Sequence, residues 1–400
     1  MSTHFTWNLF SLNCNNLPGK LLAIVSLPLM LGCQTKMTMD WKTVPPIPPR
    51  KGMSTQFGMA GPVSGADGNF VLLAGGANFE NGLPWRGGIK RYHDEIYLLE
   101  ANADGTFSWK VSEQRLPFAM AYAACVPLEN GFVGIGGETD HGALKNVIRY
   151  TFADGNVKMD SLPELPVSVT SAAATRIGER IFVMGGLDPQ RATNGFFCLR
   201  LDHLSNGWSR LPDLPVRLSH AVAVAQWDGK EQAIYLFGGR NKTAELTTFF
   251  SSVWKFSPAM DTWQQESEIS LDGHLINLAA GTGFAFGKNR IVLLGGDRGI
   301  LFNKTERFNL DIENQKEGTP KESLLKQKDD FLMRHPGFSR QILVYDTESK
   351  RWKHAGEMEG DSPATTVVFP WKDQFVVPSG EIRPGVRSDR MILVKPGWAK

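Results

Sequence analysis

The phrase IFVMGG, at residues 181–186, is a short apolar run that ends in a pair of glycines, and closely similar phrases bring the total to six along the chain. The other five are FVLLAGG (70–76), FVGIGG (132–137), IYLFGG (234–239), IVLLGG (291–296) and FVVPSG (375–380), the last with serine in place of the first glycine. The second glycines are 61, 49, 53, 57 and 84 residues apart. A period of roughly 50 residues is typical of propellers and repeat arrays.

Each unit continues with a second apolar run and, in most units, a tryptophan and a proline-containing turn. In the third unit the run FFCLRLD (196–202) is followed by Trp208 and by Leu211-Pro212. The runs are short, rich in β-branched and aromatic side chains, and bounded by Gly, Pro, Asn and Asp, which is typical of strands. We therefore predict an all-β fold, a six-bladed β-propeller in which each unit forms one four-stranded blade.

The glycine pairs and tryptophans are expected to belong to the scaffold. Strands near the axis of a propeller approach one another closely, which favours residues without a Cβ atom, and tryptophan suits packing between blades. The pattern resembles the kelch repeat over residues 41–398. Because residues 41–45 (WKTVP) look like the outer strand of a unit, we predict that the sixth blade is closed by both termini, with its inner strands from residues 363–395.

Composition argues against several classes of partner. The 400 residues include 43 Lys+Arg and 41 Asp+Glu, a formal net charge of +2. Without a basic excess or a polybasic block, the chain is not expected to bind nucleic acid or an anionic lipid surface through charge. No cysteine–histidine spacing suggests zinc and no phosphate-binding motif is present, so we predict no metal and no cofactor. Cys125 and Cys198, in apolar stretches of different units, are expected to be buried thiols.

The first 33 residues are typical of an export signal. Lys20 precedes an apolar run at residues 21–31. A bilayer span needs about 20 residues, so this run is too short to cross, but it fits the core of a secretory signal peptide. It ends in Gly32-Cys33, which resembles a bacterial lipobox. We predict a signal peptide at 1–33, the propeller at 34–400, and a periplasmic protein lipid-anchored to the bacterial membrane through Cys33. The alternative is a plain signal peptide with a coincidental cysteine.

Function is expected where the repeat is interrupted, because the repeated positions are explained by the scaffold. The loop at residues 77–94 is too long for a hairpin and dense in aromatic, basic and polar groups, and loops of that length are usually functional or disordered. Glu138 directly follows a glycine pair. Residues 297–340 form an insertion in the fifth unit, and the Leu and Phe spacing at 324–332 predicts a short helix within it.

The most specific interruption is GEIRPGVRSD, residues 380–389, directly after the sixth apolar run. Pro384-Gly385 is a turn signal. The turn folds the segment back, so Glu381 and Arg387 are expected to face a common space near the axis. Taken alone, such a pair fits either a structural salt bridge or a catalytic pair.

Three segments, AGGANF (74–79), GGET (136–139) and residues 380–389, together resemble the N-acetylneuraminate epimerases, or sialic acid mutarotases, which are periplasmic six-bladed kelch propellers. The resemblance implies a cyclically permuted branch, because in familiar bacterial members the glutamate element lies mid-chain and the Gly-Gly-Ala-x-Phe element follows it. It implies that Glu381 and Arg387 are the catalytic pair. One departure is Met120, where the family carries an arginine.

The resemblance implies an isomerase that interconverts the α and β anomers of N-acetylneuraminate. Glu381 would relay protons as a general acid–base, and Arg387 would offer a planar two-pronged donor to the substrate carboxylate. Two alternatives are a non-catalytic kelch module that binds glycan or protein, and a mutarotase for a different sugar acid, which would fit the Met120 departure. Further residues expected to line the pocket are Arg383, Arg86, His93, Glu138 and Arg298.

Overall fold

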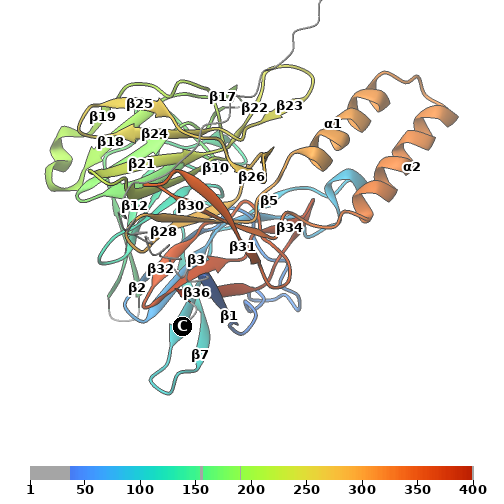
Figure 1. The fold of residues 1–400 in the computed structure, drawn as a ribbon. Coiled ribbons are helices and arrows are strands. Elements are labelled where there is room, and N and C mark those ends of the chain that lie inside the picture. Colours follow the sequence, from blue (N-terminus) through green and yellow to red (C-terminus); the bar gives the residue numbers. More distant parts are fainter. Residues whose placement is uncertain (1–36, 154–155, 190, 399–400) are drawn as a thin grey trace, which may run out of the picture. The chain divides into compact units, whose positions relative to one another are not determined.

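The computed structural model describes residues 37–153, 156–189 and 191–398, and these residues form six four-stranded antiparallel sheets (Figure 1). This confirms the predicted six-bladed β-propeller. Blade 1 consists of β2 (Val63–Asp67), β3 (Phe70–Ala74), β6 (Glu95–Ala101) and β7 (Phe107–Arg115). Blade 2 consists of β8 (Ala124–Pro127), β9 (Phe132–Ile135), β12 (Val147–Ala153) and β13 (Asn156–Ser161). Blade 3 consists of β14 (Ala173–Ile177), β15 (Arg180–Met184), β18 (Phe196–Arg200) and β19 (Trp208–Arg210). Blade 4 consists of β20 (Val222–Trp227), β21 (Gln232–Phe237), β24 (Val253–Ser257) and β25 (Thr262–Gln265). Blade 5 consists of β28 (Thr282–Phe286), β29 (Arg290–Leu294), β30 (Gln341–Asp346) and β31 (Arg351–Glu357). Blade 6 consists of β32 (Phe369–Trp371), β33 (Gln374–Pro378), β36 (Met391–Trp398) and β1 (Met37–Thr43).

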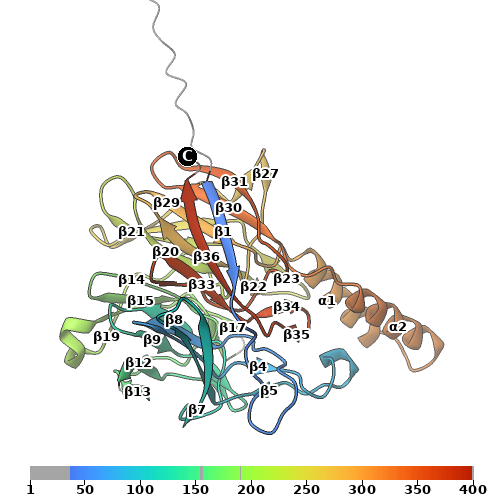
Figure 2. The ribbon, with the colours of Figure 1, turned by 90° about the horizontal axis from the view of Figure 1, so that it is seen from below.

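The sixth blade is closed by both ends of the described chain, as predicted. Strand β1 pairs antiparallel with β36, from Met37 opposite Trp398 to Thr43 opposite Ile392, and the two strands run side by side in Figure 2. Strand β1 is the outermost of the blade, and β32 is the innermost. The two ends of the propeller are therefore joined by a ladder of backbone hydrogen bonds.

The second and third strands of five blades are connected through a short two-stranded hairpin. These hairpins are β4 (Ala77–Asn78) with β5 (Arg91–Tyr92), β10 (Glu138–Thr139) with β11 (Gly142–Ala143), β16 (Leu187–Asp188) with β17 (Arg191–Ala192), β22 (Arg240–Lys242) with β23 (Thr247–Phe249), and β34 (Glu381–Arg383) with β35 (Val386–Arg387). A further hairpin, β26 (Ser270–Leu271) with β27 (His274–Leu275), precedes blade 5, and two 3₁₀ turns are η1 (Pro84–Arg86) and η2 (Leu201–Asn206).

In blade 5 a helical hairpin takes the place of the two-stranded one. It consists of α1 (Ile300–Glu313) and α2 (Thr319–Met333), which project from the propeller (Figure 1). The predicted helical insertion is thus confirmed, with two helices rather than one short helix. No helix among the described residues is long and apolar enough to cross a membrane.

A closed ring of backbone hydrogen bonds surrounds the axis. Just before each innermost strand, one residue has positive φ and donates its N–H to the carbonyl of the equivalent residue in the preceding blade, at 2.6–3.1 Å. The ring closes where the N–H of Gly61 reaches the carbonyl of Thr365. Glycine is needed at 61, since a Cβ there would lie 2.3 Å from the Tyr122 ring. The six members are Gly61, Tyr122, Ser171, His220, Ala280 and Thr365.

The repeated glycines and tryptophans hold neighbouring blades together. A Cβ at Gly238, the first glycine of its pair, would lie 2.0 Å from the Leu278 carbonyl of the next unit. Three tryptophans, one each in blades 1, 3 and 4, donate their indole N–H to a proline carbonyl in the segment before their blade, at 2.8–3.0 Å: Trp109 to Pro45, Trp208 to Pro163 and Trp263 to Pro212. The scaffold interpretation of both residue types is therefore correct.

The cysteines that the structure describes are structural thiols. Cys125 and Cys198 are free, and burial raises the pKa of the two thiols to about 12 and about 11. Thiols that are so weakly acidic are poor nucleophiles. Cys33 lies outside the described residues, so its lipidation, like the signal peptide, stays a prediction.

Candidate active site

The residue directly after the glycine pair occupies an equivalent place in every unit. Each of these residues bridges the residue before the axial ring position, for example Arg240 with Ser219 and Glu381 with Ala364. The backbone therefore distributes six side chains around the axis, at the base of the second-to-third-strand connections. In chain order they are Ala77, Glu138, Leu187, Arg240, Asp297 and Glu381.

Three consecutive members of this set, Arg240, Asp297 and Glu381, line one cavity of about 370 Å³. We call it the axial cavity, because Ala280 and Thr365 of the axial ring also line it. Helix α1 adds a wall of mixed character, in which apolar side chains such as Phe302 lie beside polar ones such as Glu306. A few converging polar groups beside apolar side chains are typical of a ligand site.

Glu381 and Arg387 lie opposite one another in the hairpin of β34 and β35. Arg387 Nη1 is 3.2 Å from Glu381 Oε1, and the backbone N–H of Gly385 donates to the same oxygen at 2.9 Å. Gly385 has φ of +73°, and a Cβ there would lie 2.5 Å from Pro84. The predicted turn therefore forms, and it brings the predicted pair together.

Of this pair, Glu381 lines the axial cavity, whereas Arg387 is held within the protein. The Arg387 side chain is 4 % exposed. Its Nε donates to the carbonyl of Ala77 at 3.2 Å, and its guanidinium lies 4.7 Å from the centre of the Phe79 ring. Arg387 is thus placed to hold the Glu381 carboxylate from the protein interior, while Glu381 itself lines the axial cavity.

Tyr122 and Met120, like Arg387, do not line the axial cavity. Burial raises the pKa of Tyr122 to about 12, with Arg387 acting in the opposite direction. Met120, which stands where the resembled family has an arginine, is 3 % exposed, and its carbonyl accepts from the N–H of Gly76. Position 120 therefore belongs to the packed interior of this chain.

Arg240 presents a guanidinium that has few partners within the part of the chain that the structure describes. Its Nη2 lies 3.1 Å from Nε2 of His220, and its guanidinium lies 4.8 Å from the centre of the Phe302 ring. Burial lowers the Arg240 pKa, and the carboxylates of Asp297 and Glu381 act against that effect. Sequence analysis missed Arg240.

Asp297 and His335 add two further ionisable groups to the axial cavity. Asp297 Oδ1 accepts from the N–H of Gly299 at 2.8 Å, and His335 Nδ1 accepts from the N–H of Gly337 at 3.0 Å. Burial raises the pKa of Asp297 and lowers that of His335. Both shifts favour the uncharged forms, so Asp297 is protonated at a higher pH than an exposed aspartate, and His335 stays neutral to a lower pH than an exposed histidine.

Glu138 and Arg86, two predicted pocket residues, have partners of their own. Lys90 Nζ and the hydroxyl of Tyr92 both contact Glu138 Oε1, at 2.9 and 2.5 Å. Arg86 forms a two-pronged ion pair with Asp329 of α2, with N–O distances of 2.6 and 2.7 Å. Neither residue lines the axial cavity. Arg86 instead ties the helical hairpin to the loop at 77–94.

Arg298 and Arg383 also lie outside the lining of the axial cavity. Arg298 donates to the carbonyl of Asn277 and to the side chains of Ser339 and Gln341, at 2.9–3.0 Å. It borders two more open grooves of about 490 and 390 Å³. Arg383 is exposed at the end of β34.

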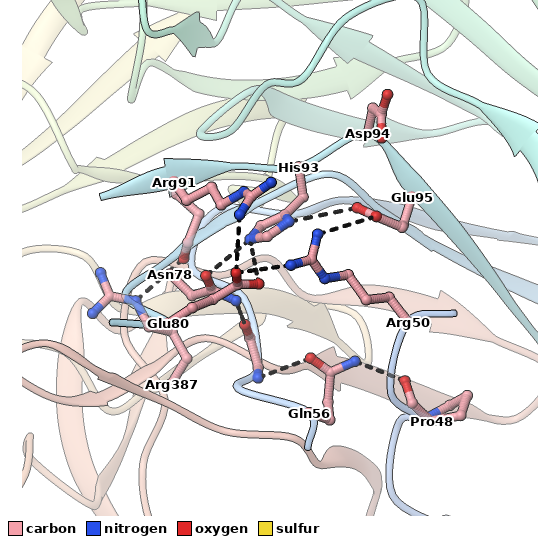
Figure 3. A network of polar contacts seen from close by, with 12 residues as sticks. Pro48, Arg50, Gln56, Asn78, Glu80, Arg91, His93, Asp94, Glu95 and Arg387 are labelled. Atoms are coloured by element: carbon pink, nitrogen blue, oxygen red, sulfur yellow. Dashed lines mark hydrogen bonds and ion pairs between the residues drawn. The ribbon is translucent and has the colours of Figure 1, made fainter. Parts of the chain in front are cut away.

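His93 belongs to a buried polar network beside blade 1, shown in Figure 3. His93 Nε2 lies 2.8 Å from Asn78 Oδ1, and its Nδ1 lies 3.5 Å from Glu95 Oε2. The enclosed void is about 10 Å³, too small for a sugar. We call this group the blade-1 network; its ionisable members are Arg50, Glu80, Arg91, His93, Glu95 and Arg115.

Arg240 and Asp297 could have been found from the sequence. Both directly follow a glycine pair, as Glu138 does, and position 381 is equivalent. The axial ring carries a second signal: its member lies fifteen residues before the second glycine in four units, at 61, 122, 171 and 365. That spacing differs in the units of Arg240 and Asp297, so it is their place directly after the glycine pair that groups them with position 381.

A family model described as N-acetylneuraminate epimerase matches residues 29–159 and 162–397. The chain belongs to this family. Similar proteins include the N-acetylneuraminate epimerase of Brucella melitensis, 29 % identical over 58 % of this chain and 58 % of that protein. The N-acetylneuraminate epimerase of Yersinia enterocolitica is 24 % identical over 60 % of this chain and 58 % of its own length. The matches thus span less than two thirds of these relatives.

The solved structure of YjhT has a similar fold. It superposes with a TM-score of 0.58 at 14 % sequence identity, covering 89 % of this chain and 99 % of that one. At this identity the likeness supports the propeller fold and leaves the chemistry to the residues of the axial cavity.

Proposed function

We propose that this chain is a mutarotase that interconverts the α and β anomers of N-acetylneuraminate or a closely related sugar acid. The observation that carries the proposal is the Glu381 carboxylate, which lines the axial cavity while Arg387 and the Gly385 N–H hold it in place. Membership of the epimerase family supports the reaction class. A cavity of about 370 Å³ is within the range of small-molecule sites.

The reaction opens and recloses the hemiketal ring. Glu381 takes the proton of the hydroxyl on the anomeric carbon, C2, as the bond between C2 and the ring oxygen breaks and C2 becomes a ketone. The ring oxygen receives a proton. After rotation about the C2–C3 bond, the same oxygen attacks the other face of C2 and returns its proton, while the ketone oxygen takes back the proton held by Glu381 and becomes the anomeric hydroxyl again. No atom or electron is gained or lost.

Two carboxyl groups of the axial cavity can carry these protons. Glu381 is suited to the exchange at the anomeric hydroxyl, because Arg387 and Gly385 fix its orientation. Burial makes Asp297 easier to protonate than an exposed aspartate, which suits it to the ring oxygen. Positioned acid–base catalysis of this kind is typically worth about 10²–10⁴-fold in rate.

The test is proton NMR of freshly released α-N-acetylneuraminate, with and without the purified chain. The proposal predicts faster appearance of the β anomer than in buffer. Acceleration with another 2-keto sugar acid, but not with N-acetylneuraminate, would retain the reaction class and change the substrate. Binding of the sugar acid without acceleration of any of them would favour the non-catalytic binding module.

A further inference from the structure

Three carboxyl groups border the axial cavity, and although Glu306 is paired with Lys242 and Glu381 with Arg387, carboxylates are unfavourable neighbours for an anionic substrate. The carboxyl groups of Asp297, Glu306 and Glu381 all line it, and Arg240 is the arginine among its lining residues. Like charges at close range repel by several kcal/mol where water is excluded. A sugar acid therefore needs a cation in this cavity that can bind its carboxylate.

Arg240 meets this requirement because its charge is not used within the protein. Among residues 37–153, 156–189 and 191–398, no carboxylate oxygen lies within the 4.0 Å of an ion pair from its guanidinium. The hydrogen bond recorded for that guanidinium joins it to a histidine, not to an acid. A charged side chain that lines a cavity without an ion-pair partner is available to a ligand.

The guanidinium groups of three other arginines already have partners within the protein. Arg387 is paired with Glu381 and bonded to a backbone carbonyl, and its side chain is 4 % exposed. Arg298 donates to three partners and borders different grooves. Arg86 is taken up by its two-pronged pair with Asp329.

His220 fixes the orientation of Arg240. A guanidinium has no acceptor, so His220 Nε2 must accept from Arg240 Nη2 at 3.1 Å, which leaves the proton on Nδ1 to be donated to Ser219 Oγ at 2.9 Å. Burial, with the charge of Arg240 as the smaller cause, lowers the His220 pKa well below its ordinary value. A neutral imidazole thus holds the guanidinium on one side while Phe302 stacks on its face.

We propose that Arg240 binds the carboxylate of the sugar acid, which leaves Arg387 to position Glu381 at the anomeric carbon. This inference rests on the proposed function. It assigns the two arginines different tasks: Arg240 recognises the substrate, whereas Arg387 acts through Glu381. Because the carboxylate is attached directly to the anomeric carbon, one cavity lined by both Arg240 and Glu381 suits both contacts.

The experiment measures mutarotation of N-acetylneuraminate and of its methyl ester, which lacks the charge, by the full chain and by Arg240→Gln and Arg240→Lys. A hydrogen bond to a charged group is worth about 1.5–3 kcal/mol, or roughly 10- to 150-fold. We expect Arg240→Gln to raise KM for the acid by such a factor, with a smaller change in kcat. Arg240→Lys should recover part of the loss. Arg334→Gln, an exposed arginine at the end of α2, is the matched control.

The ester separates a loss of charge recognition from a loss of folding. Wild-type chain should prefer the acid to the ester, and Arg240→Gln should abolish that preference. Equal KM values for acid and ester in the wild type, or an unchanged KM for the acid in Arg240→Gln, would overturn the assignment while leaving the mutarotase proposal intact. A wild-type chain that accelerates neither compound would overturn the proposed function, and this inference with it.

Discussion

The axial cavity and the blade-1 network are both dense in charge, but they differ in whether the charges are satisfied. In the network, Glu80 lies 2.8 Å from Arg50 and 3.3 Å from Arg91, and Glu95 lies 2.8 Å from Arg115. Its void is about 10 Å³. In the axial cavity, no carboxylate of the described residues pairs with Arg240, and about 370 Å³ of space adjoins it.

This difference separates charges that stabilise a fold from charges that await a ligand. Ion pairs enclosed by protein compensate the cost of burying each charge. An ionisable group that is buried beside a cavity without an ion-pair partner has lost hydration free energy that no partner offsets. Such groups are common at functional sites. By this criterion, Arg240 belongs to the site, whereas His93 and Glu95 belong to the scaffold. Glu381 is paired with Arg387 and is assigned to the site because it lines the axial cavity.

The largest expected effect is on catalysis, from Glu381→Gln. The amide keeps the size of the side chain but cannot accept the proton, so we expect the catalysed rate to fall by about 10²–10⁴-fold. Anomer interconversion followed by NMR measures the loss, and thermal unfolding checks that the variant is folded at the assay temperature, since Arg387 loses its ion-pair partner and the midpoint should fall. A variant that keeps its rate would show that the axial cavity is not the catalytic site.

The next effect is on stability, from Glu95→Gln in the blade-1 network. Contact with His93, and then with Arg115, lowers the pKa of Glu95 from 4.5 to about 2, although burial acts in the opposite direction. That shift corresponds to roughly 3 kcal/mol of stability near neutral pH. Denaturant unfolding at pH 7 should show a loss of this order, while kcat and KM of the folded variant stay near the wild type.

The pH dependence of the unfolding free energy of wild type and Glu95→Gln tests the direction of the Glu95 pKa shift. The folded-state pKa is depressed, so the contribution of Glu95 is fully present above pH 4.5 and is lost as the pH falls towards 2. The difference between wild type and Glu95→Gln should shrink across that window. Asp94→Asn is the control, since this 42 % exposed neighbour also contacts Arg115 and should cost less than about 1 kcal/mol. A difference that does not vary with pH would contradict the ion-pair explanation.

The smallest effect is expected from Asp329→Asn, which removes the exposed pair between α2 and Arg86. Asp329 also accepts from the indole N–H of Trp85 at 2.9 Å. Because α1 and α2 line the axial cavity through Phe302 and Leu332, loosening this tie should raise KM slightly and leave the unfolding midpoint nearly unchanged. Asp330→Asn, its exposed neighbour, should alter neither. A large loss of stability would show that the tie belongs with the scaffold.

The fold could be predicted from the sequence because the glycine pairs recur for a steric reason that applies in every blade. The turn at Pro384-Gly385 likewise allowed the pairing of Glu381 with Arg387 to be predicted. The surroundings of His93 could not, because Arg50, which pairs with the neighbouring Glu80 and Glu95, comes from a segment before the first blade and carries no repeat signal. The cyclic permutation implied by the family resemblance stays a prediction.

Arg240 was missed for a different reason. An arginine after a glycine pair looks like a solvated turn residue, and its importance depends on which carboxylates lie within reach, which is a property of the assembled ring. The sequence shows that Arg240 follows a glycine pair, but it does not show that no carboxylate among the described residues pairs with its guanidinium. Candidate sites on repeat folds are therefore better sought by comparing one structural position across all units.

The most direct test of the account is a crystal structure of the chain with N-acetylneuraminate bound. We expect the sugar acid in the axial cavity, with its carboxylate on the Arg240 guanidinium and its anomeric hydroxyl within hydrogen-bond distance of Glu381. A sugar acid bound in the grooves beside Arg298, or with its anomeric carbon away from Glu381, would contradict it.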